Sequence, residues 1–127
     1  ININCEKELN INGFQGEFSQ VVLNLLNNAK DILIERHTTN PIIKINAHNV
    51  PNGINITIHD NGGGIPADII NKIYDPYFTT KDEGKGTGIG LYMSKMIVEN
   101  NMQGKLYAFN DLEGSNFVIE IPTKKLI

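Results

Sequence analysis

The chain has 127 residues, of which 40% are hydrophobic and 20% charged, so we expect one globular domain spanning residues 1–127 with its own core. Its formal net charge is −3 and its 11 lysines and arginines form no cluster, which argues against nucleic acid as a partner. No apolar run approaches the roughly 18 residues that cross a bilayer, so no direct membrane contact by this domain is expected, and the single cysteine, Cys5, excludes an intrachain disulfide.

Two short extended segments, near 1–5 and 8–12, are predicted to lead into a long helix over about 17–36. Within this helix Asn24 and Asn28 lie one turn apart on one edge of the apolar stripe, although asparagine is a poor helix former. One interpretation is a solvated helix edge in an asparagine-rich protein. The other is a pair of amides at the rim of a pocket, one of which completes the shell of a Mg²⁺ ion.

Strands are predicted near 42–49 and 54–60, joined by a Pro-Asn-Gly turn. In the second strand the even-numbered positions are isoleucines that face the core, and Asp60 continues this set as the strand ends. An unpaired carboxylate on the covered side would be costly, so we expect a hydrogen-bond donor beside it. His59 points to the opposite face and is predicted to be a solvated strand residue.

Three consecutive glycines, residues 62–64, follow this aspartate and precede Ile65 and a short helix predicted after Pro66. Glycine tolerates positive φ and lets a flat ligand approach the backbone closely. One interpretation is an Asp-initiated turn between a strand and a helix. The other is a purine site, in which the exocyclic amine donates to Asp60 and the ring lies on the apolar surface of Ile65.

A stretch from about 75 to 87 has neither the helical nor the strand period, and long loops of this kind are usually functional or disordered. It ends in alternating glycines that open a second helix, predicted from near Gly88 to about Asn100. Free N–H groups at such a helix start suit an anion, and Lys81 and Lys85 could reach phosphates from the loop. The alternative is a flexible connection with helix-breaking glycines. The P-loop and dinucleotide fingerprints do not fit.

Two closing strands are predicted near 104–110 and 116–122. Helices grouped over hairpin-joined strands indicate the α+β class, as a two-layer sandwich rather than a doubly wound parallel sheet.

The order of these parts resembles the histidine kinase branch of the gyrase, Hsp90, histidine kinase and MutL superfamily. The segments that carry the resemblance are 20–29 for the N box, 60–64 for the first glycine box, 75–81 for the F box and 86–91 for the second glycine box. The resemblance implies the Bergerat ATP-binding fold, a mixed and mostly antiparallel sheet of about five strands covered on one face by three helices.

The resemblance also implies roles for individual residues in binding ATP and Mg²⁺. Asn28 would bind Mg²⁺, Asn24 would support the metal and the phosphates, and Asp60 would receive the adenine amine. Residues 75–87 would form a mobile ATP lid. The remaining residues implied to contact the nucleotide are Gly62, Gly64, Ile65, Lys81, Gly86, Thr87, Gly88, Ile89, Gly90 and Leu91.

The chain departs from the superfamily pattern at two positions. The hydrolases carry a glutamate general base four residues before the metal asparagine, where this chain has Asn24. An amide cannot take a proton from water, so this departure favours a kinase. Many kinases of the family also place a lysine where this chain has Asp31, and the corresponding phosphate contact is left open among Lys30, Arg36 and Lys81.

The function implied by the resemblance is transfer of the ATP γ-phosphate to a histidine on an upstream helical dimerisation domain of the same parent protein. A response regulator receiver domain would be the second partner. None of His37, His48 and His59 has the acidic, helical context of an acceptor, so the chain alone is expected to bind nucleotide without phosphorylating itself. A cytoplasmic location is implied, with membrane anchorage of the parent left open. The alternatives are a related serine kinase or ATPase fragment, and a regulatory nucleotide-binding module without catalysis.

Overall fold

The computed structural model describes residues 2–5, 15–75 and 90–122. The elements in chain order are β1 (Asn2–Cys5), α1 (Gln15–Glu35), β2 (Ile43–Val50), β3 (Gly53–Asp60), α2 (Gly90–Met96), the π-helical turn η1 (Ile97–Asn101), β4 (Lys105–Asn110) and β5 (Ser115–Pro122). The predicted 8–12 strand and most of the predicted lid, residues 76–87, lie outside the described residues.

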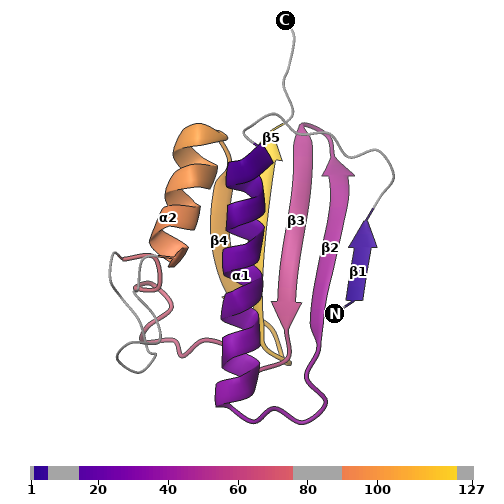
Figure 1. Cartoon of the computed structure of the whole chain (residues 1–127), viewed down its shortest axis with the longest axis vertical. Helices are drawn as coiled ribbons and strands as arrows, with labels where there is room; N and C mark the ends of the chain where they lie inside the picture. The colour runs from indigo at the N-terminus through magenta and orange to yellow at the C-terminus, as the bar shows by residue number, and fades with distance from the viewer. Residues whose placement is uncertain (1, 6–14, 76–89, 123–127) are drawn as a thin grey trace, which may run out of the picture.

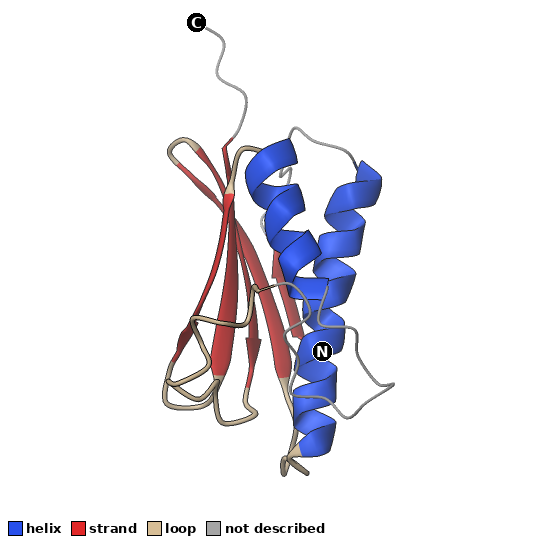
Figure 2. Cartoon of the chain, turned by 90° about the vertical axis from the view of Figure 1, so that its left-hand side faces the viewer, coloured by secondary structure: helices blue, strands red, loops and turns tan. Residues whose placement is uncertain are grey.

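The strands form one sheet in the order β1-β2-β3-β5-β4. Strands β2 to β5 are antiparallel to their neighbours, and β1 adds to the edge of the sheet in parallel with β2. Both helices lie on one face of this sheet (Figure 2). The α+β two-layer sandwich expected from the sequence is therefore confirmed.

The expectation of three helices is not met, because the described residues contain two helical rods, α1 and the continuous α2–η1. The segment after Pro66, predicted as a helix, forms a series of turns over 67–74. The N–H groups of Ile69 and Ile70 share the Pro66 carbonyl at 3.1 Å, and Lys72 then bonds back three residues to Ile69 at 2.8 Å. The segment is rich in isoleucine, which favours helix only weakly, and Ile73 is buried in the core.

The core lies between α1 and the covered face of the sheet. The stripe predicted on α1 supplies buried side chains at helical spacing: Val21, Leu25, Ala29 and Leu33. They pack in one cluster with the isoleucines of β3 and with Ile119 and Ile121 of β5. Full burial of each large aliphatic side chain stabilises the fold by about 1.5–3 kcal/mol. Among the described residues, no helix is long and apolar enough to span a bilayer.

This topology places distant parts of the chain around α1. Figure 1 shows the carboxyl end of β3 pointing downward and the first turn of α2 as the lower end of that helix, with α1 running along the strands between them in this view. Asp60 is the last residue of β3 and Gly90 the first of α2. The sequence motifs at these two positions are therefore placed on either side of α1.

Candidate functional site

Asp60 is a buried carboxylate whose oxygens are both hydrogen-bonded. Its side chain ends β3 with a relative exposure of 1%. Oδ1 accepts from the Gly62 N–H at 2.9 Å, and Oδ2 accepts from the Ser115 hydroxyl at 2.6 Å. The predicted donor beside the buried acid is confirmed. A carboxylate oxygen can accept two hydrogen bonds, so each oxygen keeps capacity for a further donor such as an amine.

Ser115, the side-chain partner of Asp60, was not identified by sequence reasoning. It is fully buried at the start of β5 and lies 55 positions away in the chain. The preceding Gly114 allows this approach, because a Cβ at that position would lie 2.1 Å from the carbonyl oxygen of Asp60. The pairing of β3 with β5 brings these residues together, and no local sequence pattern reveals that pairing.

The three glycines after Asp60 form a tight turn with two positive φ angles, 95° at Gly63 and 91° at Gly64. Gly62 is also sterically constrained, because an added Cβ would lie 2.8 Å from the Ile32 side chain and 3.0 Å from Oδ1 of Asp60. The expectation that these glycines permit positive φ is confirmed at positions 63 and 64. At position 62 the absence of a side chain lets the backbone reach the carboxylate.

Two side chains from other elements hold this glycine turn in place. Arg36, just after α1, donates from Nη1 to the carbonyl oxygens of Gly62 and Gly64, both at 2.6 Å. Asn110, at the end of β4, accepts from the Ile65 N–H and donates to the Ile65 carbonyl, both at 2.8 Å. Arg36, considered from the sequence as a phosphate ligand, is thus bonded to the backbone of the turn.

The two asparagines of α1 differ in their contacts. Asn24 accepts from Gln20 at 3.1 Å and donates to the hydroxyl of Ser94 at 3.2 Å. Ser94 is fully buried on α2, so this bond joins the two helices. Asn28, one turn further on, is half-buried, and within the described part of the chain no hydrogen bond to its amide is found. Among the described residues its oxygen thus has acceptor capacity left for a ligand.

The glycine-rich entry to α2 is only partly described. Gly90 is exposed, and a Cβ at this position would meet no atom within 4 Å, while Leu91 packs against the core cluster. The other residues expected to contact the nucleotide from this segment lie outside the described residues: Lys81, Gly86, Thr87, Gly88 and Ile89.

The prediction that His59 is a solvated strand residue is wrong. Its exposure is 6%, and its ring lies among Asn116 of β5 and two carboxylates of the turn between β4 and β5, Asp111 and Glu113. Strand alternation assigns His59 correctly to the face opposite the helices. The turn covers that face locally, because β5 pairs with β3 at Asn116 opposite His59.

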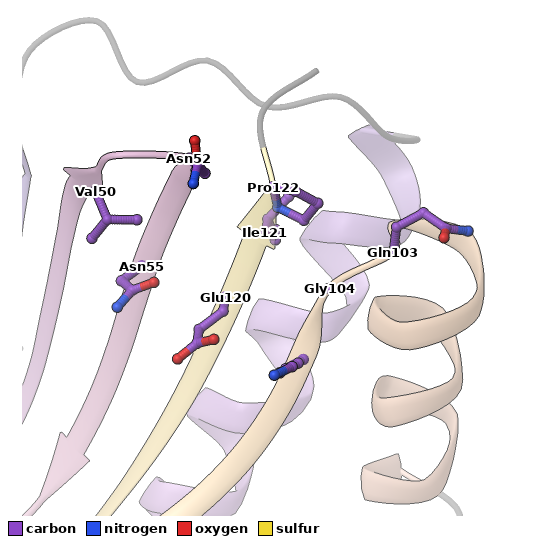
Figure 3. A pocket seen from close by; sticks show the side chains of 10 residues that line it. Val50, Asn52, Asn55, Gln103, Gly104, Glu120, Ile121 and Pro122 are labelled. Atoms are coloured by element: carbon purple, nitrogen blue, oxygen red, sulfur yellow. The ribbon is translucent and has the colours of Figure 1, made fainter. Parts of the chain in front are cut away.

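A surface hollow of about 250 Å³ lies at the other end of the sheet, beside the β2–β3 hairpin (Figure 3). Its lining includes Asn55, Gln103 and Glu120. Because β3 begins at this hollow and ends at Asp60, the hollow is separate from the candidate nucleotide site.

Residues 14–125 match the family described as histidine kinase-, DNA gyrase B-, and HSP90-like ATPase. The chain is 40% identical over 119 residues to the two-component sensor PprA of Pseudomonas aeruginosa, an alignment that covers 88% of this chain and 12% of PprA. It is 38% identical over 115 residues to sporulation kinase A of Bacillus subtilis, covering 90% of this chain and 18% of that kinase. The chain thus spans less than a fifth of the length of these relatives.

The fold is similar to that of the catalytic domain of histidine kinase ThkA, with a TM-score of 0.80, 31% identity and coverage of 98% of this chain and 82% of that domain. A second ThkA structure, a complex with the response regulator protein TrrA, matches with a TM-score of 0.77 and 28% identity and covers 96% of this chain and 33% of ThkA.

Proposed function

Because this chain belongs to the family of histidine kinase-, DNA gyrase B- and HSP90-like ATPases, we propose that it is the ATP-binding catalytic domain of a two-component sensor histidine kinase. The domain binds Mg-ATP and donates the γ-phosphate to a histidine of a separate upstream dimerisation domain. The observation that carries this proposal is the buried Asp60 carboxylate, which has acceptor capacity left and stands beside the glycine turn.

The adenine end of the nucleotide belongs at Asp60. The exocyclic amine of adenine is a donor, and a buried acceptor of fixed position discriminates it from the carbonyl oxygen of guanine. The carboxylate is preorganised by Gly62 and Ser115. Ile65, buried and held by Asn110, supplies apolar surface next to the turn.

The metal end belongs at Asn28 on α1, where an amide oxygen would join phosphate and water oxygens around Mg²⁺. Asn24 lies one turn earlier, and its amide bonds to Gln20 and Ser94. An amide in that position cannot act as a general base for water. The site therefore suits phosphoryl transfer, which depends mainly on positioning and on neutralising charge, rather than hydrolysis. The phosphates would be held at the start of α2 by Gly86, Thr87, Gly88 and Gly90. Residues 75–87 would form the lid.

The acceptor histidine and the receiver domain are partners outside this chain. The relatives are named as sensors and kinases, and ThkA forms a complex with a response regulator. By analogy, we assign this chain a response regulator as its downstream partner and a cytoplasmic site of action, where ATP is available.

Nucleotide titration of the 127-residue chain tests this proposal. We expect Mg²⁺-dependent binding of ATP and much weaker binding of GTP. Asp60→Asn should weaken ATP binding by about 10- to 100-fold, because a hydrogen bond to a charged group contributes about 1.5–3 kcal/mol. Asp68→Asn, a change at an exposed carboxylate of the following turn, is the matched control and should bind ATP normally.

Thermal unfolding without nucleotide must accompany this titration, since Asp60 also holds the glycine turn. A folded Asp60→Asn variant with the ATP affinity of the wild type would refute the adenine assignment.

A further inference from the structure

A histidine and two carboxylates converge on the side of the sheet that faces away from the helices. Each of His59, Asp111 and Glu113 offers one ligand atom, and these atoms all lie within 4.8 Å of one another. We propose that these three side chains bind a divalent transition-metal ion of the zinc class. This site goes beyond the proposed nucleotide function and does not depend on it.

Asn116 determines which nitrogen of the His59 ring is available to a metal. Its Nδ2 donates to Oδ2 of Asp111 at 2.9 Å, so its Oδ1 is the atom that faces the ring. That oxygen lies 3.0 Å from Nδ1 of His59. An amide oxygen only accepts, so Nδ1 carries a hydrogen and donates it. Metal-binding histidines commonly use such an outer partner to fix the tautomer and leave the other nitrogen free.

The free nitrogen, Nε2, faces a carboxylate oxygen. It lies 3.2 Å from Oε1 of Glu113. In the neutral ring both atoms are acceptors, and two acceptors at this distance repel each other unless a cation lies between them. The separation also falls within the roughly 2.7–3.2 Å of an ordinary N–H···O hydrogen bond, which a ring protonated at Nε2 would form. It suits two adjacent ligands that each lie about 2.0–2.2 Å from one zinc ion.

Asp111 lies on the Nδ1 side of the ring, so its carboxylate must shift toward Nε2 to become the third ligand. The Oδ1 atom of Asp111 accepts from the N–H groups of Glu113 and Gly114, both at 2.9 Å. The Oδ2 atom of Asp111 then lies 3.5 Å from Nδ1 of His59.

The Glu113 side chain is 65% exposed and can move to complete the shell. One imidazole and two carboxylates, with water in the remaining position, form a donor set that zinc accepts.

The proposed metal site and the candidate nucleotide site both involve the turn between β4 and β5. No side chain proposed to bind the metal is also proposed to bind the nucleotide. The Glu113 carbonyl accepts from the Gly63 N–H at 3.1 Å, and Ser115 follows directly to hold Asp60. Metal binding must therefore be measured without nucleotide, so that a failure of this proposal is separate from a failure of the proposed function.

Calorimetric titration of the 127-residue chain with Zn²⁺ alone tests the site. We expect one ion per chain, and at least tenfold weaker binding in Glu113→Gln and Asp111→Asn. Asparagine at position 111 keeps an oxygen for the two backbone N–H groups, so the turn should persist. Glu35→Gln, at an exposed carboxylate of α1, and His48→Gln, at an exposed histidine of β2, are the matched controls and should bind Zn²⁺ as the wild type does.

Nitrogen-15 NMR of the histidine side chains provides the second measurement. Zinc should shift the Nε2 resonance of His59 while the Nδ1 hydrogen persists. Absence of binding, or binding that Glu113→Gln leaves undiminished, would overturn the proposal. A His59 ring that carries hydrogens on both nitrogens and does not respond to Zn²⁺ would also overturn it, since the cluster would then be an ion pair with a protonated histidine.

Discussion

At the scale of single residues, Ser115 determines whether the Asp60 carboxylate is satisfied. Its hydroxyl is the donor to Oδ2, at 2.6 Å in a fully buried position. Ser115→Ala should lower the free energy of unfolding by about 1–3 kcal/mol, the cost of a buried acceptor that loses its donor. Ser19→Ala, at an exposed position of α1, should change it by less than about 0.5 kcal/mol. Urea denaturation measures the free energy of unfolding of both variants. Equal stability of the two would contradict the role of Ser115 as the donor that satisfies Asp60.

Tyr74 is a second residue whose environment predicts a measurable effect. Among the described residues its buried hydroxyl has no hydrogen-bond partner. Burial, and secondarily the charge of Glu99, raises the pKa of Tyr74 far above its usual 10. A raised pKa in the folded state means that stability is complete below about pH 10 and is lost as the pH rises toward the folded value.

Tyr74→Phe removes that titration. At pH 7 the variant should be as stable as the wild type or up to about 1 kcal/mol more stable, because an unpaired buried hydroxyl is lost. Between pH 10 and pH 11 the wild type should lose more stability than the variant. Chemical denaturation at pH 7, 10 and 11 gives the difference, and parallel curves at all three pH values would show that the hydroxyl is solvated.

At the scale of elements, the close contact between the β4–β5 turn and the end of β3 depends on one glycine. A Cβ at Gly114 would lie 2.1 Å from the Asp60 carbonyl, whereas one at Gly16 would meet nothing within 4 Å. Gly114→Ala should therefore cost about 1–3 kcal/mol of stability or more. Gly16→Ala, near the start of α1, should stabilise by up to about 1 kcal/mol, because glycine is a poor helix former. Thermal unfolding of the two variants measures this difference in stability. Similar melting temperatures would rule out the close contact between Gly114 and the Asp60 carbonyl.

Periodicity predicted the elements that bury a regular face. The α1 stripe and the isoleucine alternation of β3 located both elements within two residues of their observed ends. The short helix expected from a proline at an early helical position is not formed after Pro66, where turn hydrogen bonds replace it. Periodicity failed at His59, because alternation shows which face a side chain takes but not what covers that face. The covering turn is set by Asp111, whose side chain bonds to the N–H groups of Glu113 and Gly114.

At the scale of the whole molecule, the candidate site is assembled from elements far apart in the chain. Asp60 was predicted because its own strand points it inward, and the resemblance supplied its role together with that of Asn28. The sequence did not predict which side chains position Asp60 and the glycine turn: Ser115, Arg36 and Asn110. Their contacts span 26 to 55 positions, and local patterns carry no information about such pairings.

The arrangement of the three histidines leads to a prediction for the chain as a whole. His59 is buried between carboxylates, His48 lies on strand β2, and His37 follows α1 with a φ of 50°. None of the three lies within a helix, whereas the acceptor is expected in an acidic, helical context. The chain incubated with ATP labelled at the γ-phosphate should therefore bind nucleotide and acquire no acid-labile label.

Under the proposed function, adding the helical dimerisation domain proposed to lie upstream should place an acid-labile, alkali-stable label on that domain, because it would supply the acceptor histidine. Acid-labile label on the chain alone would contradict the prediction. Acid-stable label on a partner protein would instead favour a serine kinase, and rapid release of phosphate without any partner would favour an ATPase. Because Asn24 cannot take a proton and its amide is held between Gln20 and Ser94, slow hydrolysis with transfer only to the added domain is the expected outcome.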